Sequence, residues 1–325
     1  MRHNRLIGIA AIAALPLLAG FQSAQAADVK ITPLGAHKGE FCHLDRAMVL
    51  EDPDGTRLLY DPGRTVAGPE DARLGKIDVV LVSHMHGDHV GDKTIAAEGP
   101  GGECAKPAFP NNALPNTNAV NIAIAKDAKI VTGSEMPRFF GSKMKALGGD
   151  PKNSQLVRFG ASTKVGGVTI TTVPAVHSNG IAGGMIGGQL GELLNAAGLT
   201  AYAGPPTGYV LTFSNGLGIY LSGDTGVTAE QDTVVRQLYN AQLVVMNIGD
   251  TFTTGPKEAA WVINELVQPA SVIASHANQP STKSGKVIEG TRLDTFMKAA
   301  NVPVHTPLSS HTMSFNSDGN CVAGC

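Results

Sequence analysis

The sequence has few aromatic residues, few charged residues and only four cysteines, and these scarcities narrow the class of protein. Aromatic residues make up 5% of the 325 residues, with a single tryptophan, and charged residues make up 16%. The sequence has 25 basic and 27 acidic residues and no cluster of basic residues, so we expect no nucleic-acid partner. The 42% of hydrophobic residues and the 39 glycines indicate a loop-rich globular protein and exclude a disordered chain.

Long apolar runs are also lacking, except at the N-terminus. Two arginines precede an apolar stretch over residues 6–20, and Ala24-Gln25-Ala26 has the small residues of a cleavage site. The stretch is too short to span a membrane stably. We therefore predict a secretory signal peptide over 1–26, with a retained anchor as the alternative. The mature domain, 27–325, is expected to be periplasmic or secreted, without an integral membrane span.

The four cysteines all lie in this expected mature chain. In an oxidising compartment they are expected to pair, but four cysteines allow three pairings and the sequence does not select one. We favour Cys42–Cys104, which would pin a long loop, together with Cys321–Cys325, which would close a short C-terminal ring. None belongs to a C-x-x-C pair, so a cysteine zinc site is not expected.

Short β runs joined by turns alternate with helical patterns along the chain. The first half has expected strands at 29–34, 47–51, 56–60 and 77–83. Expected helices follow at 117–125 and 135–146. The second half has an expected strand pair at 165–173, around Gly166-Gly167, and expected strands at 209–213, 217–222, 242–246 and 271–274. A capping box at Thr228-Ala229-Glu230-Gln231 and the pair Gly255-Pro256 each predict the start of a helix. The repetition of β-hairpins followed by βα units favours two similar α/β half-folds packed face to face.

Two segments do not fit this pattern. Residues 90–118 are rich in glycine, proline and asparagine, and a loop of this length is expected to form a wall of the active site or, alternatively, an idle surface loop. Residues 178–206 are glycine-rich and almost uncharged. For them an apolar lid over the substrate and an insertion packed on the core are equally favoured.

Three of the ten histidines fall within six residues, His84-Met85-His86-Gly87-Asp88-His89. This run directly follows the expected strand at 77–83. Imidazole and carboxylate groups are the ligands that zinc and manganese take from proteins. The alternative, a run of solvated polar residues, would use lysine, glutamate or serine more readily. The run therefore predicts a metal-binding loop at a strand end.

Ligands packed this tightly at a strand end can reach two metal ions from one loop. One loop cannot complete two metal sites, so further ligands are expected downstream. His177, Asp224 and His276 each come just after an apolar β run. Each of them alone could be a core or turn residue. Their common position at strand ends indicates that they face one shared cleft.

The order H-x-H-x-D-H, followed by a histidine, an aspartate and a histidine, resembles the metallo-β-lactamase superfamily. The strings Asp61-Pro62-Gly63 and Ser222-Gly223-Asp224-Thr225-Gly226 narrow the resemblance to the general metal-dependent hydrolases. That branch includes the ascorbate-phosphate lactonase-like and N-acyl-phosphatidylethanolamine-hydrolysing enzymes. The resemblance spans residues 29–315 and implies a four-layer αββα sandwich with the site at one edge of the two sheets.

The resemblance also implies two divalent metal ions, with zinc expected and manganese or iron as the alternatives. It assigns His84, His86 and His177 to the first metal. It assigns Asp88, His89 and His276 to the second metal, and Asp224 to a bridging position between the two. Asp88 and Asp224 would be the catalytic carboxylates, with Asp88 orienting the nucleophile. Asp61 would either orient the ligand loops from behind or simply form a turn before proline.

These expectations together describe an exported dinuclear hydrolase that uses a metal-bridging hydroxide on a small ester, lactone or phosphodiester. A β-lactamase-type antibiotic hydrolase is an alternative, disfavoured because those enzymes lack an aspartate at the position of Asp224. A non-catalytic metal-binding sensor on the same fold is the other. His43 is expected to be a surface or structural residue rather than a substrate group, and no role is assigned to His305 or His311. The sequence does not indicate the oligomeric state.

Overall fold

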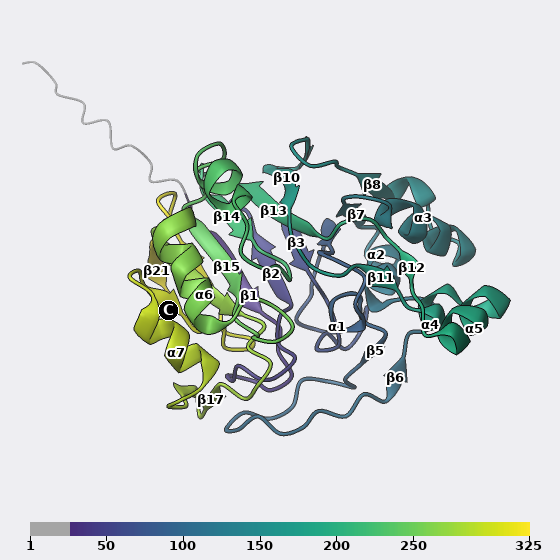
Figure 1. The fold of residues 1–325 in the computed structure, drawn as a ribbon, viewed down its shortest axis with the longest axis horizontal. Helices are drawn as coiled ribbons and strands as arrows, with labels where there is room; N and C mark the ends of the chain where they lie inside the picture. Colours follow the sequence, from purple (N-terminus) through teal and green to yellow (C-terminus); the bar gives the residue numbers. More distant parts are fainter. Residues whose placement is uncertain (1–26) are drawn as a thin grey trace, which may run out of the picture.

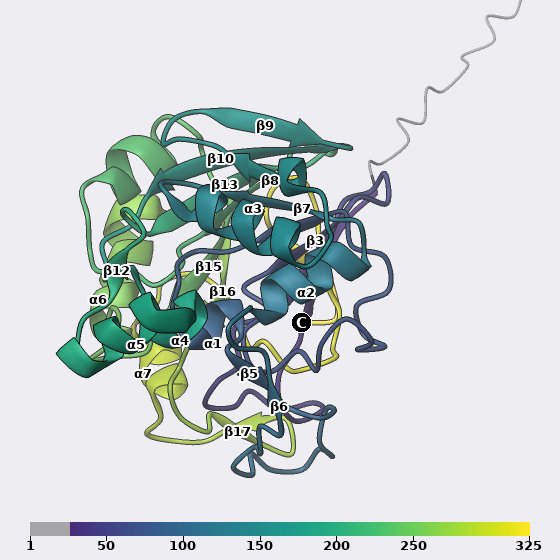
Figure 2. The ribbon, with the colours of Figure 1, turned by 90° about the vertical axis from the view of Figure 1, so that its right-hand side faces the viewer.

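The computed structural model describes residues 27–325, and the predicted signal peptide lies outside the described residues. Two large β-sheets pack face to face, and helices cover both outer faces (Figures 1 and 2). This arrangement is the four-layer αββα sandwich that the family resemblance implies. The two halves of the chain each supply most of one sheet, as their repeated β-hairpin and βα pattern indicates.

The strands follow one another in each sheet as follows. The first sheet has the order β21 (Cys321–Ala323), β20 (Met313–Phe315), β1 (Val29–Pro33), β2 (Met48–Glu51), β3 (Arg57–Tyr60), β4 (Val79–Leu81), β7 (Lys129–Thr132) and β8 (Ser154–Leu156). The second sheet has the order β19 (Val304–His305), β16 (Ser271–Ser275), β15 (Leu243–Asn247), β14 (Gly218–Leu221), β13 (Thr207–Thr212), β10 (Val168–Pro174) and β9 (Ser162–Val165). The last two strands of the chain, β20 and β21, therefore return to the first sheet.

Helices and short ribbons complete the fold. On the side of the first sheet lie α1 (Gly87–Val90), α2 (Asn118–Ala125), α3 (Met136–Ala146) and the 3₁₀ turn η1 (Pro151–Asn153). The second sheet is covered by η2 (Gln231–Arg236), α6 (Pro256–Trp261), η3 (Val262–Val267) and α7 (Arg292–Ala299). The small ribbons are β5 (Lys93–Thr94) with β6 (Asn111–Asn112) and β17 (Thr282–Lys283) with β18 (Lys286–Val287).

The alternation of side chains along the strands explains the layers. On β2, Met48 and Leu50 enter the apolar layer between the sheets, while Val49 packs under the helices of the first sheet. On β14, Ile219 lies between the sheets and Tyr220 packs under the helices of the second sheet. Successive residues of a strand face opposite sides of the sheet. The sequence of a strand that is buried on both faces is therefore a continuous apolar run.

The helix predicted at the capping box differs from the observed one. The backbone N–H of Thr228 donates to Oε1 of Gln231 at 3.0 Å, but Thr228 Oγ1 has no partner among residues 27–325. The cap is thus half formed, and the helix that follows, η2, has π geometry. The helix opened by Pro256 begins as predicted and then continues as a second π-helix, η3.

Both favoured disulfides are present. Cys42 and Cys104 are bonded with their Cα atoms 5.4 Å apart, and Cys321 is bonded to Cys325. Cys104 lies in the 90–118 segment, which also contains the β5–β6 ribbon and is therefore not without structure. The disulfide ties this segment to the loop between β1 and β2.

Residues 178–206 form an insertion that packs on the core. It consists of the ribbon β11 (Gly180–Ile181) with β12 (Ala201–Tyr202) and the helices α4 (Gly183–Ile186) and α5 (Gly188–Ala197). Ile181, Met185 and Ala203 join the apolar layer beneath α2 and α3.

Across the described residues, every helix falls short of the length and apolarity that crossing a bilayer would require.

Candidate metal centre

The seven predicted ligands gather where strands of both sheets end. His84 follows β4, and the remaining residues of its motif run into α1. His177, Asp224 and His276 follow β10, β14 and β16, which all run in the same direction because β14, β15 and β16 are parallel and β13 is antiparallel to both β10 and β14. Parallel strands end at one edge of a sheet, so these side chains meet there.

The carboxylate of Asp224 occupies the middle of the cluster. Its Oδ2 atom lies 3.1 Å from Nε2 of His276 and 3.3 Å from Nε2 of His89. The same oxygen lies 3.7 Å from Nε2 of His177 and 3.8 Å from Nε2 of His84. One oxygen therefore faces four imidazole nitrogens, two from each half of the sandwich.

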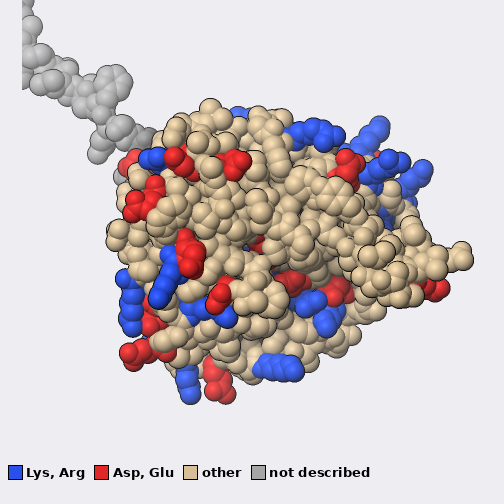
Figure 3. Space-filling view, in the orientation of Figure 1, with Lys and Arg blue, Asp and Glu red and all other residues tan. Residues whose placement is uncertain are grey.

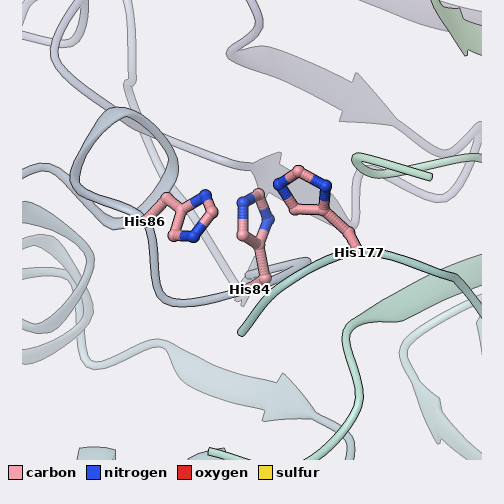
Figure 4. Close-up of side chains that lie close together, drawn as sticks. All are labelled: His84, His86 and His177. Carbon is pink, nitrogen blue, oxygen red and sulfur yellow. The ribbon is translucent and has the colours of Figure 1, made fainter. Parts of the chain in front are cut away.

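The donor atoms fit divalent metal ions. Ligand atoms lie within 4.8 Å of one another in the group His84, His86 and His177, and likewise in the group Asp88, His89 and His276. Figure 4 shows the three imidazoles of the first group facing each other. The buried Nε2 atoms of His84, His89 and His276 have no hydrogen-bond partner among the described residues. Buried polar atoms are costly without a partner, and ions bound by the two groups would satisfy all three nitrogen atoms.

Asp61 and Ser83 hold the ligand loop from behind. The buried carboxylate of Asp61 accepts hydrogen bonds from Ser83 N–H at 2.8 Å, Ser83 Oγ at 2.7 Å and His89 Nδ1 at 2.8 Å. The bond at Nδ1 leaves Nε2 of His89 directed at the cluster. Asp61 also adopts a left-handed φ of 40° in its turn, so it fills both roles weighed from the sequence.

Arg46 is a functional candidate that the sequence does not reveal. Its buried guanidinium places Nη1 2.8 Å from Oδ2 of Asp88, and Nη2 donates to Oδ1 of Asn278 at 3.4 Å. The ion pair stabilises Asp88 in its ionised form and fixes its position. Arg46 stands 42 residues before Asp88, so no local pattern could connect the two.

The charges of the cluster suit metal binding. Burial would raise the pKa of Asp224, but His89 and His276 hold it well below its usual value. Burial holds the pKa of His84 well below its usual value. Burial would also lower the pKa of His89, but the carboxylates of Asp224, Asp61 and Asp88 raise it to about 10. Without metal, the site therefore holds a proton on His89, which an incoming cation must displace.

The cluster opens into a cleft of about 490 Å³. Its walls are formed by His43, Leu44, Arg64, His86, Asp88, His177, Ser178, Asp224, Thr251, Phe252, His276 and Asn278. None of these comes from 90–118, so the expectation that this segment forms a wall of the site is wrong. The segment is linked to the wall of the cleft through its disulfide, because Cys104 is bonded to Cys42, the neighbour of His43.

The lining of the cleft also shows where the other residues and segments considered in the sequence analysis lie. His43 is exposed at its wall, which places it both on the surface and within reach of a substrate. The insertion contributes only Ser178 to the lining, so its lid role is not supported. Asn179, overlooked in the sequence, joins the insertion to the ligand loop by accepting from Met85 N–H at 2.9 Å. His305 packs against Phe315 away from the cleft.

Comparison with known proteins agrees with this geometry. The profile of the Beta-lactamase superfamily domain matches residues 56–277, a range that contains all seven candidate ligands. A UPF0173 metal-dependent hydrolase of Koribacter versatilis is 29% identical over 253 residues, which cover 77% of this chain and 87% of that protein. Another, of Cupriavidus necator, is 30% identical over 263 residues, which cover 77% of each chain.

Solved structures show the same fold. Igni18, described as a novel metallo hydrolase from the hyperthermophilic archaeon Ignicoccus hospitalis KIN4/I, aligns with a TM-score of 0.56 at 20% identity. The alignment covers 89% of this chain and 98% of Igni18. The profile match, the curated relatives and the shared fold together assign the chain to the metallo-β-lactamase superfamily, among the UPF0173 metal-dependent hydrolases.

Proposed function

We propose that this metal-dependent hydrolase is exported, binds two metal ions and cleaves a small ester, lactone or phosphodiester. The position of Asp224 carries the proposal. Its Oδ2 atom lies between two ligand groups that share no residue, where one carboxylate can contact two ions at once. Zinc is the expected ion, and manganese and iron are the alternatives for these nitrogen and oxygen donors.

The residues of the chain divide the work of such a reaction. Two divalent ions would supply Lewis acidity and an activated water. His84, His86 and His177 would hold one ion, and Asp88, His89 and His276 the other. The carboxylate of Asp88, held by Arg46 and facing the cleft, would orient the attacking water by accepting its hydrogen bond.

Export is supported by two independent features. The first is the arginine-led apolar stretch and small-residue site over residues 1–26. The second is the pair of disulfides, which form and persist in oxidising compartments. We propose a periplasmic or secreted protein that acts on a small-molecule substrate.

Two rival functions use the same cluster. Antibiotic hydrolysis would suit an exported protein, but the central aspartate at 224 argues against it. A non-catalytic protein on the same fold would not need the whole ligand set of a dinuclear enzyme, whereas all seven candidate ligands are present and close together. The hydrolase proposal therefore explains more of the site.

The proposal is tested on the mature protein loaded with zinc or manganese. Hydrolysis of a phosphodiester, a lactone and a β-lactam is measured side by side, with metal content determined for each sample. We expect turnover of the phosphodiester or the lactone, and Asp224→Ala should lower it by about 100-fold or more and lose the second metal. Asp318→Ala, at an exposed site away from the cleft, is the matched control.

Three other outcomes would contradict the proposal. Rapid turnover of the β-lactam alone would favour the antibiotic hydrolase. Two bound metals without turnover of any of the three would favour the sensor. Full activity in Asp224→Ala would remove the central role of that carboxylate.

A further inference from the structure

Arg64 stands in the wall of the metal cleft with part of its guanidinium unengaged. Its Nε donates to Oδ1 of Asp92 at 2.6 Å and its Nη2 to Oδ2 of Asp92 at 2.9 Å. Within residues 27–325, Arg64 Nη1 makes no hydrogen bond or ion pair. A guanidinium has five N–H donors in a fixed plane, so Asp92 fixes one edge and leaves the other available to a ligand.

This pair is built into the metal-binding loop. A Cβ atom added to Gly87 would lie 2.6 Å from Cγ of Asp92, so a larger residue at this position would displace the carboxylate that holds Arg64. Gly63, next to Arg64, has a left-handed φ of 49° and donates its N–H to the carbonyl of His89 at 2.8 Å. Arg64 is thereby held at a fixed place relative to the candidate metal ligands.

An aromatic side chain lines the same cleft. Phe252 is 69% exposed, although burial would stabilise a phenyl ring. The two residues before it, Asp250 and Thr251, both have left-handed φ values of 54° and 49°. This conformation is costly for a β-branched residue, and such strain is retained where a site requires it. Leu44 adds a second apolar surface to the lining.

The charge balance of the cleft favours an anion. Asp92 is paired with Arg64 and Asp88 with Arg46, which leaves Asp224 as the carboxylate of the lining without a partnering arginine. Bound divalent cations would exceed its charge, so the cleft would carry a positive potential. A neutral, fully polar substrate would use neither the potential nor the exposed ring.

We propose that the substrate is an amphipathic anion. A carboxylate or phosphate group of the substrate binds the free edge of Arg64, and an apolar group packs on Phe252 and Leu44. This inference rests on the proposed hydrolase function, whose substrate class it specifies. Arg64 is then a residue that determines specificity.

A pair of aryl esters of equal length tests the proposal by kinetics. One 4-nitrophenyl ester ends in a carboxylate and the other in a methyl group. We expect the metal-loaded protein to prefer the anionic ester in kcat/KM, and Arg64→Gln to reduce this preference about tenfold, mainly through KM. Arg64→Lys keeps the charge and should retain part of the preference. Arg138→Gln, exposed on α3, is the matched control and should leave both rates unchanged.

Direct binding separates this inference from the proposed function. Calorimetry measures 4-phenylbutanoate and its neutral amide on the metal-loaded protein, with metal content determined for every variant. Weaker carboxylate binding in Arg64→Gln, and weaker binding of both ligands in Phe252→Ala, would support the inference even if no ester were hydrolysed. Ester hydrolysis with equal preference in wild type and Arg64→Gln, at equal metal content, would overturn the inference and leave the hydrolase function intact.

Discussion

Single side chains behind the cleft decide how the histidines are presented. Asp61 receives three hydrogen bonds and no solvent, and one of the three fixes the ring of His89. Ser83 contributes two of these bonds and also places its Oγ 3.0 Å from Nδ1 of His84. Two neighbouring ligands are therefore oriented by one buried pair.

Replacing Asp61 by asparagine is expected to weaken metal binding by about 10- to 100-fold. The amide keeps the shape of the side chain, but its NH₂ group cannot accept from His89 or Ser83, so a buried donor loses its acceptor. Competition with a chromophoric chelator measures the affinity. Asp318→Asn serves as the control, and unchanged affinity in Asp61→Asn would show that the ring is fixed by other contacts.

The sequence could predict the seven candidate ligands because each follows an apolar strand and local order is enough to place it. It could not predict Arg46, Arg64 or Asn179, since their partners are distant in the chain. A single arginine or asparagine has no pattern of its own. Their roles depend on the packing of loops that only the folded structure brings together.

Among the secondary-structure elements, the helices α2 and α3 and the central strands were predicted, whereas β7, β8, β19, β20 and β21 were not. Burial on two faces gives the central strands continuous apolar runs, and the ends of the predicted strands differ from the observed ends by only a few residues. The two π-helices, η2 and η3, were not predicted, because an apolar period of three to four residues does not distinguish α from π geometry. The 90–118 segment was misplaced since glycine and proline content does not reveal which surface a loop covers.

The two disulfides should differ in their effect on stability. Cys42–Cys104 closes a loop of 62 residues, and chain entropy predicts that its removal costs about 4 kcal/mol of unfolding free energy. Cys321–Cys325 spans 4 residues and should cost about 2 kcal/mol. Denaturant unfolding of the double serine variants measures both. A larger loss for the C-terminal pair would contradict this ranking.

At the scale of the whole molecule, the metal cluster joins the two halves of the sandwich. His84, His86, Asp88 and His89 follow the first sheet, and the other three candidate ligands follow strands of the second sheet. Bound ions would therefore link the halves and stabilise the folded state over the unfolded one. Chelation should lower the melting temperature.

The size of this stabilisation should depend on pH in a defined direction. In the metal-free protein His89 has a raised pKa of about 10, against about 6.5 when unfolded, so its protonation stabilises the fold fully below pH 6.5. That contribution is lost as the pH rises towards 10, whereas a metal-bound His89 carries no proton. The gap in stability between zinc-loaded and chelated protein should widen from pH 7 to pH 9. Differential scanning calorimetry measures it, and a constant gap would contradict the assignment of His89.

The insertion between β10 and β13 leaves and rejoins the body of the protein at one place. Gly180 pairs with Tyr202 and Ile181 with Ala201, so the two ends of the excursion lie side by side. A change in the length of α5, which buries only Gly191, could be accommodated there without moving His177 or Asp224. The size of the surface beside the cleft is therefore set separately from the chemistry of the metal ligands.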